Sequence, residues 1–123
     1  MAHCPLVAVV DDDDSVRESL SGLFRSVGFA ARGYASAAAF LQSDDLPRTD
    51  CVILDVRMPG MGGLELQRRL VACHPEVPVI FMTAHDDARI RSQALSGGAV
   101  DYLIKPFSEE ALLDAVRVAL GSR

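Results

Sequence analysis

The sequence predicts an α/β fold in which a doubly wound parallel sheet of five strands carries five helices on its two faces. Five short apolar runs rich in β-branched residues alternate strictly with segments of helical periodicity. Runs such as "CVIL" are apolar throughout, which is typical of parallel strands buried on both faces. No linker or internal repeat divides the 123 residues, so we expect one domain spanning 1–123.

The expected strands coincide with the five apolar runs. The second run, "FAARGY", is the least apolar, so we place its strand at an edge of the sheet. The strands are expected at 5–10, 29–34, 51–55, 77–82 and 100–104.

The segments between these runs predict the helices. In the first, apolar side chains recur at helical spacing until Gly28, and Ser15 with Glu18 matches a capping box at its start. Ser108 is expected to cap the last helix and Gly121 to end it. The helices are expected at about 16–27, 36–43, 63–74, 86–96 and 108–120.

Composition argues against several functional classes. Seventeen acidic residues against twelve basic ones give a formal net charge of −5, the wrong sign for holding nucleic acid or anionic lipid by the overall field. No apolar run approaches the roughly 20 residues that span a bilayer, and the start lacks signal-peptide features. The three cysteines form no CxxC pair. We therefore expect a cytoplasmic protein without zinc and without direct contact to nucleic acid or membrane.

Polar side chains follow four of the five expected strands. Asp11 and Asp12 follow the first, Asp55 ends the third, Thr83 follows the fourth and Lys105 follows the fifth. Ligands of open parallel sheets bind outside the carboxyl ends of the strands, so these groups should converge. Three clustered carboxylates must share protons or bind a cation, and an all-oxygen site favours Mg²⁺. A hydroxyl and an ammonium nearby would complete a cradle for phosphate.

Lys105 is the only lysine in the chain. A surface lysine after a strand would be the simpler interpretation of its position alone. Its coincidence with three acids and a threonine at the other strand ends favours a functional role. The following Pro106 restricts the backbone there, and a cis bond is one way to fix the direction of the side chain.

Four segments occur in a characteristic order and spacing: "VVDDD", "LDVRMPGMGG", "MTAH" and "GAVDYLIKPF". Together they resemble the CheY-like receiver domain of bacterial two-component response regulators over almost the whole chain. The segments "FMTAHDD" and "GAVDYLIKPF" are similar to those of the FixJ-like branch, which includes regulators of symbiotic nitrogen-fixation genes. The resemblance implies a flavodoxin-like fold with strand order 2-1-3-4-5.

The resemblance also implies the acceptor and metal chemistry. Asp55 would accept a phosphoryl group from a histidine kinase, and Asp11, Asp12, Asp55 and the backbone carbonyl of Arg57 would hold Mg²⁺. The side chain of Arg57 adds a positive charge that could compete with the metal. Asp13 and its neighbour Asp14 are not needed for the cation and are expected to cap and charge the next helix.

A switch is implied in the same way. Thr83 and Lys105 would contact the phosphoryl group, and Tyr102 would turn inward into the space that Thr83 vacates. This would alter a surface formed by the fourth helix, fifth strand and fifth helix. The expected outcome is a weak homodimer of the phosphorylated form and control of a downstream output such as transcription.

Two other functions fit parts of the pattern. A Mg²⁺-dependent aspartyl-phosphate phosphatase would use the same acceptor, but it usually needs a carboxylate two residues later, where this chain has Arg57. A receiver that only binds proteins and is never phosphorylated would not need Asp55, Thr83 and Lys105 together. We therefore expect a signalling protein that catalyses only its own phosphorylation and dephosphorylation, and not an enzyme acting on an external substrate.

Overall fold

The computed structural model describes residues 4–121 and contains a five-stranded parallel sheet in the order β2-β1-β3-β4-β5. The predicted fold class and strand order are confirmed, and the weakly apolar second strand lies at an edge. Each strand falls within a residue or two of its predicted range. The strands are β1 (Leu6–Val10), β2 (Ala30–Tyr34), β3 (Cys51–Asp55), β4 (Val79–Thr83) and β5 (Asp101–Ile104).

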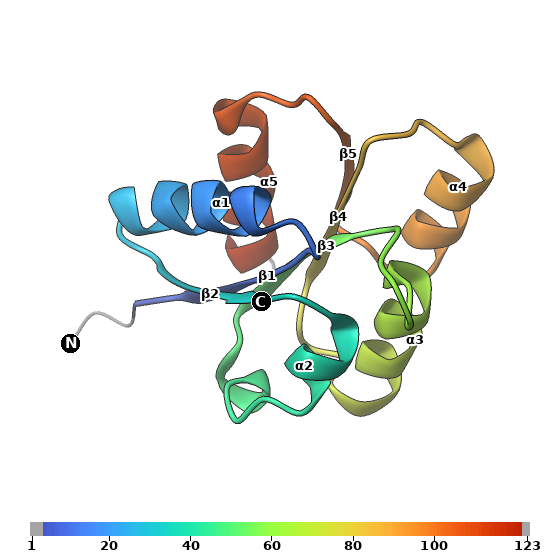
Figure 1. Ribbon diagram of the computed structural model, residues 1–123, viewed down its shortest axis with the longest axis horizontal. Coiled ribbons are helices and arrows are strands. Elements are labelled where there is room, and N and C mark those ends of the chain that lie inside the picture. The colour runs from blue at the N-terminus through green and yellow to red at the C-terminus, as the bar shows by residue number, and fades with distance from the viewer. Residues whose placement is uncertain (1–3, 122–123) are drawn as a thin grey trace.

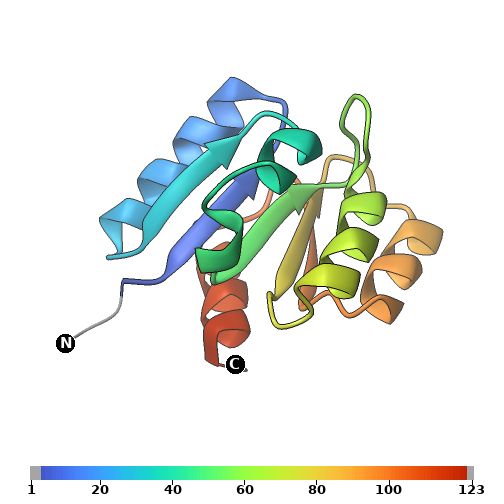
Figure 2. The same cartoon turned by 90° about the horizontal axis from the view of Figure 1, so that it is seen from below.

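Helices cover both faces of the sheet (Figures 1 and 2). In Figure 1, α1 and α5 lie on one face, and α2, α3 and α4 lie on the other. A short 3₁₀ turn, η1, precedes β3 and was not anticipated from the sequence. The helical elements are α1 (Asp14–Ser26), α2 (Ala37–Leu41), η1 (Leu46–Arg48), α3 (Gly63–Cys73), α4 (Ala88–Ser96) and α5 (Glu109–Gly121).

Alternation along the buried strands divides the core into two layers. In β1, Val7 and Val9 pack in the cluster that contains α1 and α5 side chains, whereas Ala8 and Val10 pack in the cluster on the other face. Successive side chains of a strand point to opposite faces, so a strand buried on both sides must be apolar at every position. The sheet is thereby held between two apolar layers, with its strand ends left for polar groups.

The start of α1 differs from the predicted capping box. Asp13 is the N-cap, and its carboxylate accepts hydrogen bonds from the backbone N–H groups of Ser15 and Val16. The prediction that Ser15 and Glu18 cap the helix is therefore wrong, because Asp13 stands two residues earlier in an extended conformation and takes that role. The competing expectation that Asp13 caps and Asp14 charges the first turn is confirmed.

Two other helix starts bear on the strand ends. Ser108 caps α5 as predicted, since its hydroxyl accepts from the Ala111 N–H at 3.0 Å. α4 begins at Ala88, two residues later than expected, because the Asp87 carboxylate caps it. Gly121 is the last helical residue that the structure describes. Among residues 4–121, no helix has the length and apolar character required to cross a bilayer.

Candidate functional site at the carboxyl ends of the strands

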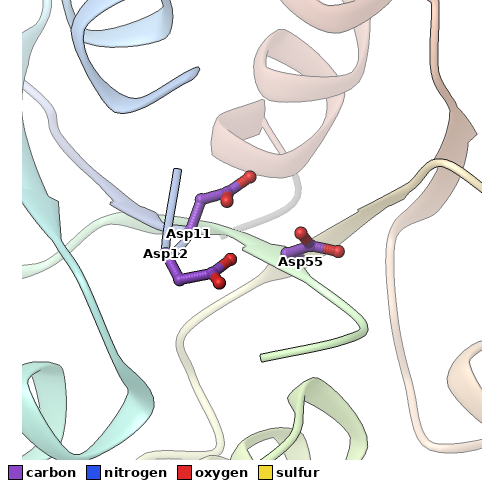
Figure 3. Close-up of side chains that lie close together, drawn as sticks. All are labelled: Asp11, Asp12 and Asp55. Carbon is purple, nitrogen blue, oxygen red and sulfur yellow. The ribbon is translucent and has the colours of Figure 1, made fainter. Parts of the chain in front are cut away.

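Three carboxylates meet where β1 and β3 end. One carboxylate oxygen from each of Asp11, Asp12 and Asp55 lies within 4.8 Å of the other two (Figure 3). Asp11 is fully buried, Asp12 is exposed, and the Asp55 side chain keeps 14% of its surface exposed. A group that combines a buried anchor with an accessible oxygen can hold a hard cation that retains several waters. The sequence-based expectation that these strand ends converge therefore agrees with the geometry.

Lys105 places its ammonium among these carboxylates. Its Nζ atom lies 3.2 Å from Asp11 Oδ2 and 3.7 Å from Asp55 Oδ2. The Lys105 backbone N–H donates to the Thr83 carbonyl at 2.7 Å, which ties the β5 end to the β4 end. The Lys105–Pro106 peptide bond is cis. A half-buried ammonium at this position can neutralise negative charge brought in by a ligand.

The pKa of Asp55 is raised above its ordinary value. Burial disfavours the charged carboxylate and is the main cause; Lys105 acts in the opposite direction, and the neighbouring Asp11 adds to the rise. The backbone N–H of Arg57 donates to Asp55 Oδ1 at 3.3 Å, which favours the ionised form. A cation bound at this cluster would favour it further.

The loop after Asp55 turns back so that α3 can start against the strand. A Cβ atom on Gly63 would lie 2.5 Å from the Asp55 carbonyl oxygen and 2.7 Å from a Leu54 side-chain carbon. Only glycine fits that approach, and the Gly63 N–H donates to the Val56 carbonyl at 2.9 Å. The glycine-rich segment "MPGMGG" thus shapes the turn beside the acidic cluster, and the Arg57 side chain just before it is exposed.

Thr83 and Tyr102 lie on the β4–β5 side of the site. Thr83 is buried, and its hydroxyl accepts the backbone N–H of His85 at 3.2 Å. Tyr102 is 8% exposed and packs against Phe81, with ring centroids 6.4 Å apart. The guanidinium of Arg91 lies 5.6 Å from the centre of the Tyr102 ring. The Tyr102 ring therefore points into the protein in this structure, packed between Phe81 and the Arg91 guanidinium.

The Tyr102 hydroxyl is buried without a partner. It is the one fully buried side-chain oxygen or nitrogen among the described residues that lacks a hydrogen bond. Burial, with a further contribution from Asp87, raises the pKa of this phenol above its ordinary value. An unpaired buried hydroxyl lowers the free energy of unfolding, so the packing around Tyr102 leaves one hydrogen bond unmade.

One contact at the site was not anticipated from the sequence. The Arg17 guanidinium donates from Nη1 to the carbonyl oxygen of Asp11 at 2.7 Å and forms an ion pair with Asp14. Because α1 begins at Asp14, the last residue of the acidic run, a basic residue one turn into the helix can reach back to the strand end. The position of Arg17 one turn after the acidic run was the only sign of this contact in the sequence. An arginine that points into solvent would show the same spacing.

Comparison with known proteins gives a consistent result. Residues 7–117 match the family described as the response regulator receiver domain. The chain is 47% identical over 114 residues to nodulation protein W of Bradyrhizobium diazoefficiens, covering 93% of this chain and 50% of that protein. It is 47% identical over 115 residues to the transcriptional regulatory protein FixJ of Azorhizobium caulinodans, covering 94% and 54%. A response regulator receiver protein from Burkholderia phymatum has a similar structure, with a TM-score of 0.82, 52% identity and 95% of each chain covered.

The chain therefore belongs to the receiver-domain family of two-component response regulators. Within that family it is similar to the FixJ-like regulators, as the sequence segments predicted. Receiver domains are regulatory domains that interact with histidine kinases, and they are not classical enzymes. The chain spans about half the length of the curated relatives that it matches.

Proposed function

We propose that residues 1–123 form a receiver unit that accepts a phosphoryl group on Asp55 from a histidine kinase in a Mg²⁺-dependent reaction. The observation that carries this proposal is the Asp55 carboxylate, which lies beside two further aspartates and within 3.7 Å of an ammonium. Such an arrangement suits the transfer of a phosphoryl group, because positioning and charge neutralisation supply most of the catalysis.

In the proposed reaction, an ionised Asp55 oxygen attacks the phosphorus of a phosphohistidine. The bond between phosphorus and the imidazole nitrogen breaks, and its electron pair leaves with that nitrogen. Mg²⁺ held by Asp11, Asp12, Asp55 and the Arg57 carbonyl would neutralise charge on the phosphoryl oxygens. Lys105 would do the same through its ammonium, and its short distance to Asp11 keeps it in position before the donor arrives.

The proposed output uses Thr83 and Tyr102. Phosphorylation would draw the Thr83 hydroxyl away from the His85 N–H toward the new oxygens. The loop after β4 could then rearrange around the unpartnered Tyr102 hydroxyl, and the surface of α4, β5 and α5 would change. Phosphorylation shifts this equilibrium only by contacting one conformer better than the other.

We further propose weak dimerisation of the phosphorylated form through that surface. Leu95 on α4 and Val118 on α5 are exposed apolar side chains that would be partly covered. Sedimentation with and without a stable phosphoryl mimic tests this step, and an unchanged monomer with the mimic bound would contradict it. Because relatives of the chain are named as transcriptional regulators, a cytoplasmic role in transcription control is the output we propose.

Intact-mass measurement tests the acceptor chemistry. We expect a single phosphoryl adduct after incubation with Mg²⁺ and acetyl phosphate, and no adduct in Asp55→Asn or with the metal chelated. Asp44→Asn is the matched control, because it removes one exposed carboxylate elsewhere on the surface. An adduct of unchanged yield in Asp55→Asn would refute Asp55 as the acceptor.

A further inference from the structure

The side chain of Arg17 connects three elements at the edge of the acidic cluster. From the first turns of α1 it reaches back to the Asp11 carbonyl at the end of β1, and it also pairs with Asp14. Its methylene stem lies over Gly33 of β2, where a Cβ atom would come within 3.2 Å of Arg17 Cδ. Although charged, the side chain is only 19% exposed. An arginine packed on its stem and bonded at its head is held in one geometry.

Each polar group of Asp11 has a partner, and Arg17 supplies the last of them. The Asp11 N–H donates to the Tyr34 carbonyl at 3.1 Å. Its carboxylate accepts the Asp13 N–H at 2.9 Å and faces the Lys105 ammonium at 3.2 Å. The remaining group is the main-chain carbonyl, which accepts from Arg17. A buried carbonyl that lost this donor would carry a desolvation cost or turn toward another partner.

The orientation of that carbonyl matters most for Asp12. Within residues 4–121, the Asp12 carboxylate takes part in no hydrogen bond or ion pair, so only its backbone directs it toward Asp55. The carbonyl that Arg17 holds belongs to the peptide unit joining Asp11 to Asp12. Figure 3 shows the Asp12 carboxylate turned toward Asp55. Without the bond from Arg17, the backbone torsions on either side of this peptide are less restrained, and a change in them that is not compensated would turn the Asp12 side chain away from the cluster.

We propose that Arg17 is a positioning residue for the divalent cation, acting through the peptide that joins Asp11 to Asp12. The inference rests on the proposed function, because it concerns the cation that the phosphoryl transfer would require. Arg17 touches neither the cation nor the phosphoryl group in this account. It fixes the direction in which an otherwise unrestrained carboxylate points.

Loss of the Arg17 charge and loss of its hydrogen bond would change the Mg²⁺ affinity in opposite directions. A positive charge near the cluster repels a divalent cation, so removal of that charge alone would tighten Mg²⁺ binding. Loss of the hydrogen bond to the Asp11 carbonyl would loosen the site and weaken binding. The ion pair with Asp14 offsets much of the charge effect, so we expect the loss of position to dominate.

The same helix offers a matched control at its other end. Arg25 donates from Nη2 to the carbonyl of Ala31 at 3.0 Å, so it also ties α1 to a strand end through a backbone oxygen. That carbonyl lies on β2 and is not adjacent to any of the three clustered carboxylates. Arg25→Ala therefore removes an equivalent charge and an equivalent type of bond without touching the proposed cation site.

Calorimetric titration with Mg²⁺ alone tests the inference on the whole chain. We expect Arg17→Ala to weaken Mg²⁺ binding about tenfold, at the lower end of the range for residues that orient metal ligands. Arg25→Ala should bind Mg²⁺ as the unmodified chain does. Arg17→Lys should fall between, since an ammonium lacks the forked donors that reach a carbonyl and a carboxylate together.

A fourth variant separates position from charge. Gly33→Val keeps every charge but places side-chain atoms where the Arg17 stem lies, so it should displace the guanidinium and weaken Mg²⁺ binding as Arg17→Ala does. The carbonyl ¹³C resonance of Asp11 and the amide resonance of Asp12 should move in both variants and stay unchanged in Arg25→Ala. This signature is independent of phosphorylation activity.

The possible results distinguish failure of the Arg17 inference from failure of the proposed function. Equal or tighter Mg²⁺ binding by Arg17→Ala would overturn the inference while leaving the proposed function intact. Equal weakening by Arg25→Ala would also overturn it, because general loosening of α1 would then be the cause. If Arg17→Ala does not fold, Gly33→Val and Arg17→Lys test the inference instead. Equal or tighter Mg²⁺ binding by both of these variants would overturn it. Absence of Mg²⁺ binding by the unmodified chain would refute the proposed function itself and the inference with it.

Discussion

The β1–α1 end of the site and the β4–β5 side differ in how completely their polar groups are satisfied. At Asp11, both backbone groups and both carboxylate oxygens have partners. At Tyr102, a buried hydroxyl has none, although the ring is packed against Phe81. The first region is organised before any ligand arrives, which suits chemistry that depends on fixed geometry. The second retains a local cost that another conformation could relieve, which suits a switch.

The largest effect is expected from the charge of Asp55. Its pKa is raised in the folded protein, mainly by burial, so the folded state holds the proton more tightly than the unfolded state. As pH rises through the unfolded value of about 3.9, the unfolded state loses its proton first, so the contribution of Asp55 to stability falls. At neutral pH without Mg²⁺, Asp55→Asn should therefore unfold at higher urea than the unmodified chain.

The pH dependence and a control make this prediction specific. The difference between Asp55→Asn and the unmodified chain should shrink as pH falls below the unfolded value, where both side chains are neutral. Asp44→Asn removes an equal charge from an exposed position and should change stability little. A stability gain that is equal at acidic and neutral pH would show that desolvation of the charge is not the cause.

Two tyrosines allow the comparison to be tested with the same substitution. Tyr102→Phe removes a buried hydroxyl without a partner and should raise the free energy of unfolding by about 1 kcal/mol. Tyr34→Phe removes a hydroxyl that contacts Ser43 and Asp45 at 3.1 and 3.0 Å, and it should lower that free energy by about 1 kcal/mol. Urea unfolding measures both, and destabilisation by Tyr102→Phe would contradict the cost assigned to its unpartnered hydroxyl.

The smallest effect is expected at Arg57, on the loop beside the cluster. Its exposed side chain adds a screened positive charge near Asp55, so Arg57→Ala should tighten Mg²⁺ binding by about two- to threefold. Arg68→Ala, at an exposed position on α3, is the charge-matched control. Equal or weaker Mg²⁺ binding by Arg57→Ala would show that the Arg57 side chain does not weaken Mg²⁺ binding.

The sequence predicted the residues at the strand ends because topology alone brings them together. Strict alternation of strands and helices implies a parallel sheet, and a parallel sheet gathers residues such as Asp11, Asp55 and Lys105 at one edge. The edge position of β2 followed from its weak apolar character. These inferences depend on periodicity and order along the chain, which a sequence displays directly.

Details set by competition between neighbouring side chains could not be predicted in the same way. Asp13 and Ser15 are both good helix caps, and the local backbone conformation decided for Asp13. The inward orientation of Tyr102 depends on packing against Phe81, and the reach of Arg17 depends on the absence of a side chain at Gly33. Each outcome requires three-dimensional distances between elements that are separate in sequence.

NMR relaxation dispersion on backbone amides tests the central claim, that the β1–α1 end is fixed and the β4–β5 side can switch. In the unphosphorylated chain with Mg²⁺, we expect microsecond-to-millisecond exchange at residues 83–91 and at Tyr102, and none at 11–17. Addition of beryllium trifluoride, a phosphoryl mimic, should suppress the exchange by favouring one conformer. Exchange concentrated at 11–17, or a β4–β5 side whose exchange is absent and whose resonances the mimic leaves unmoved, would contradict the account.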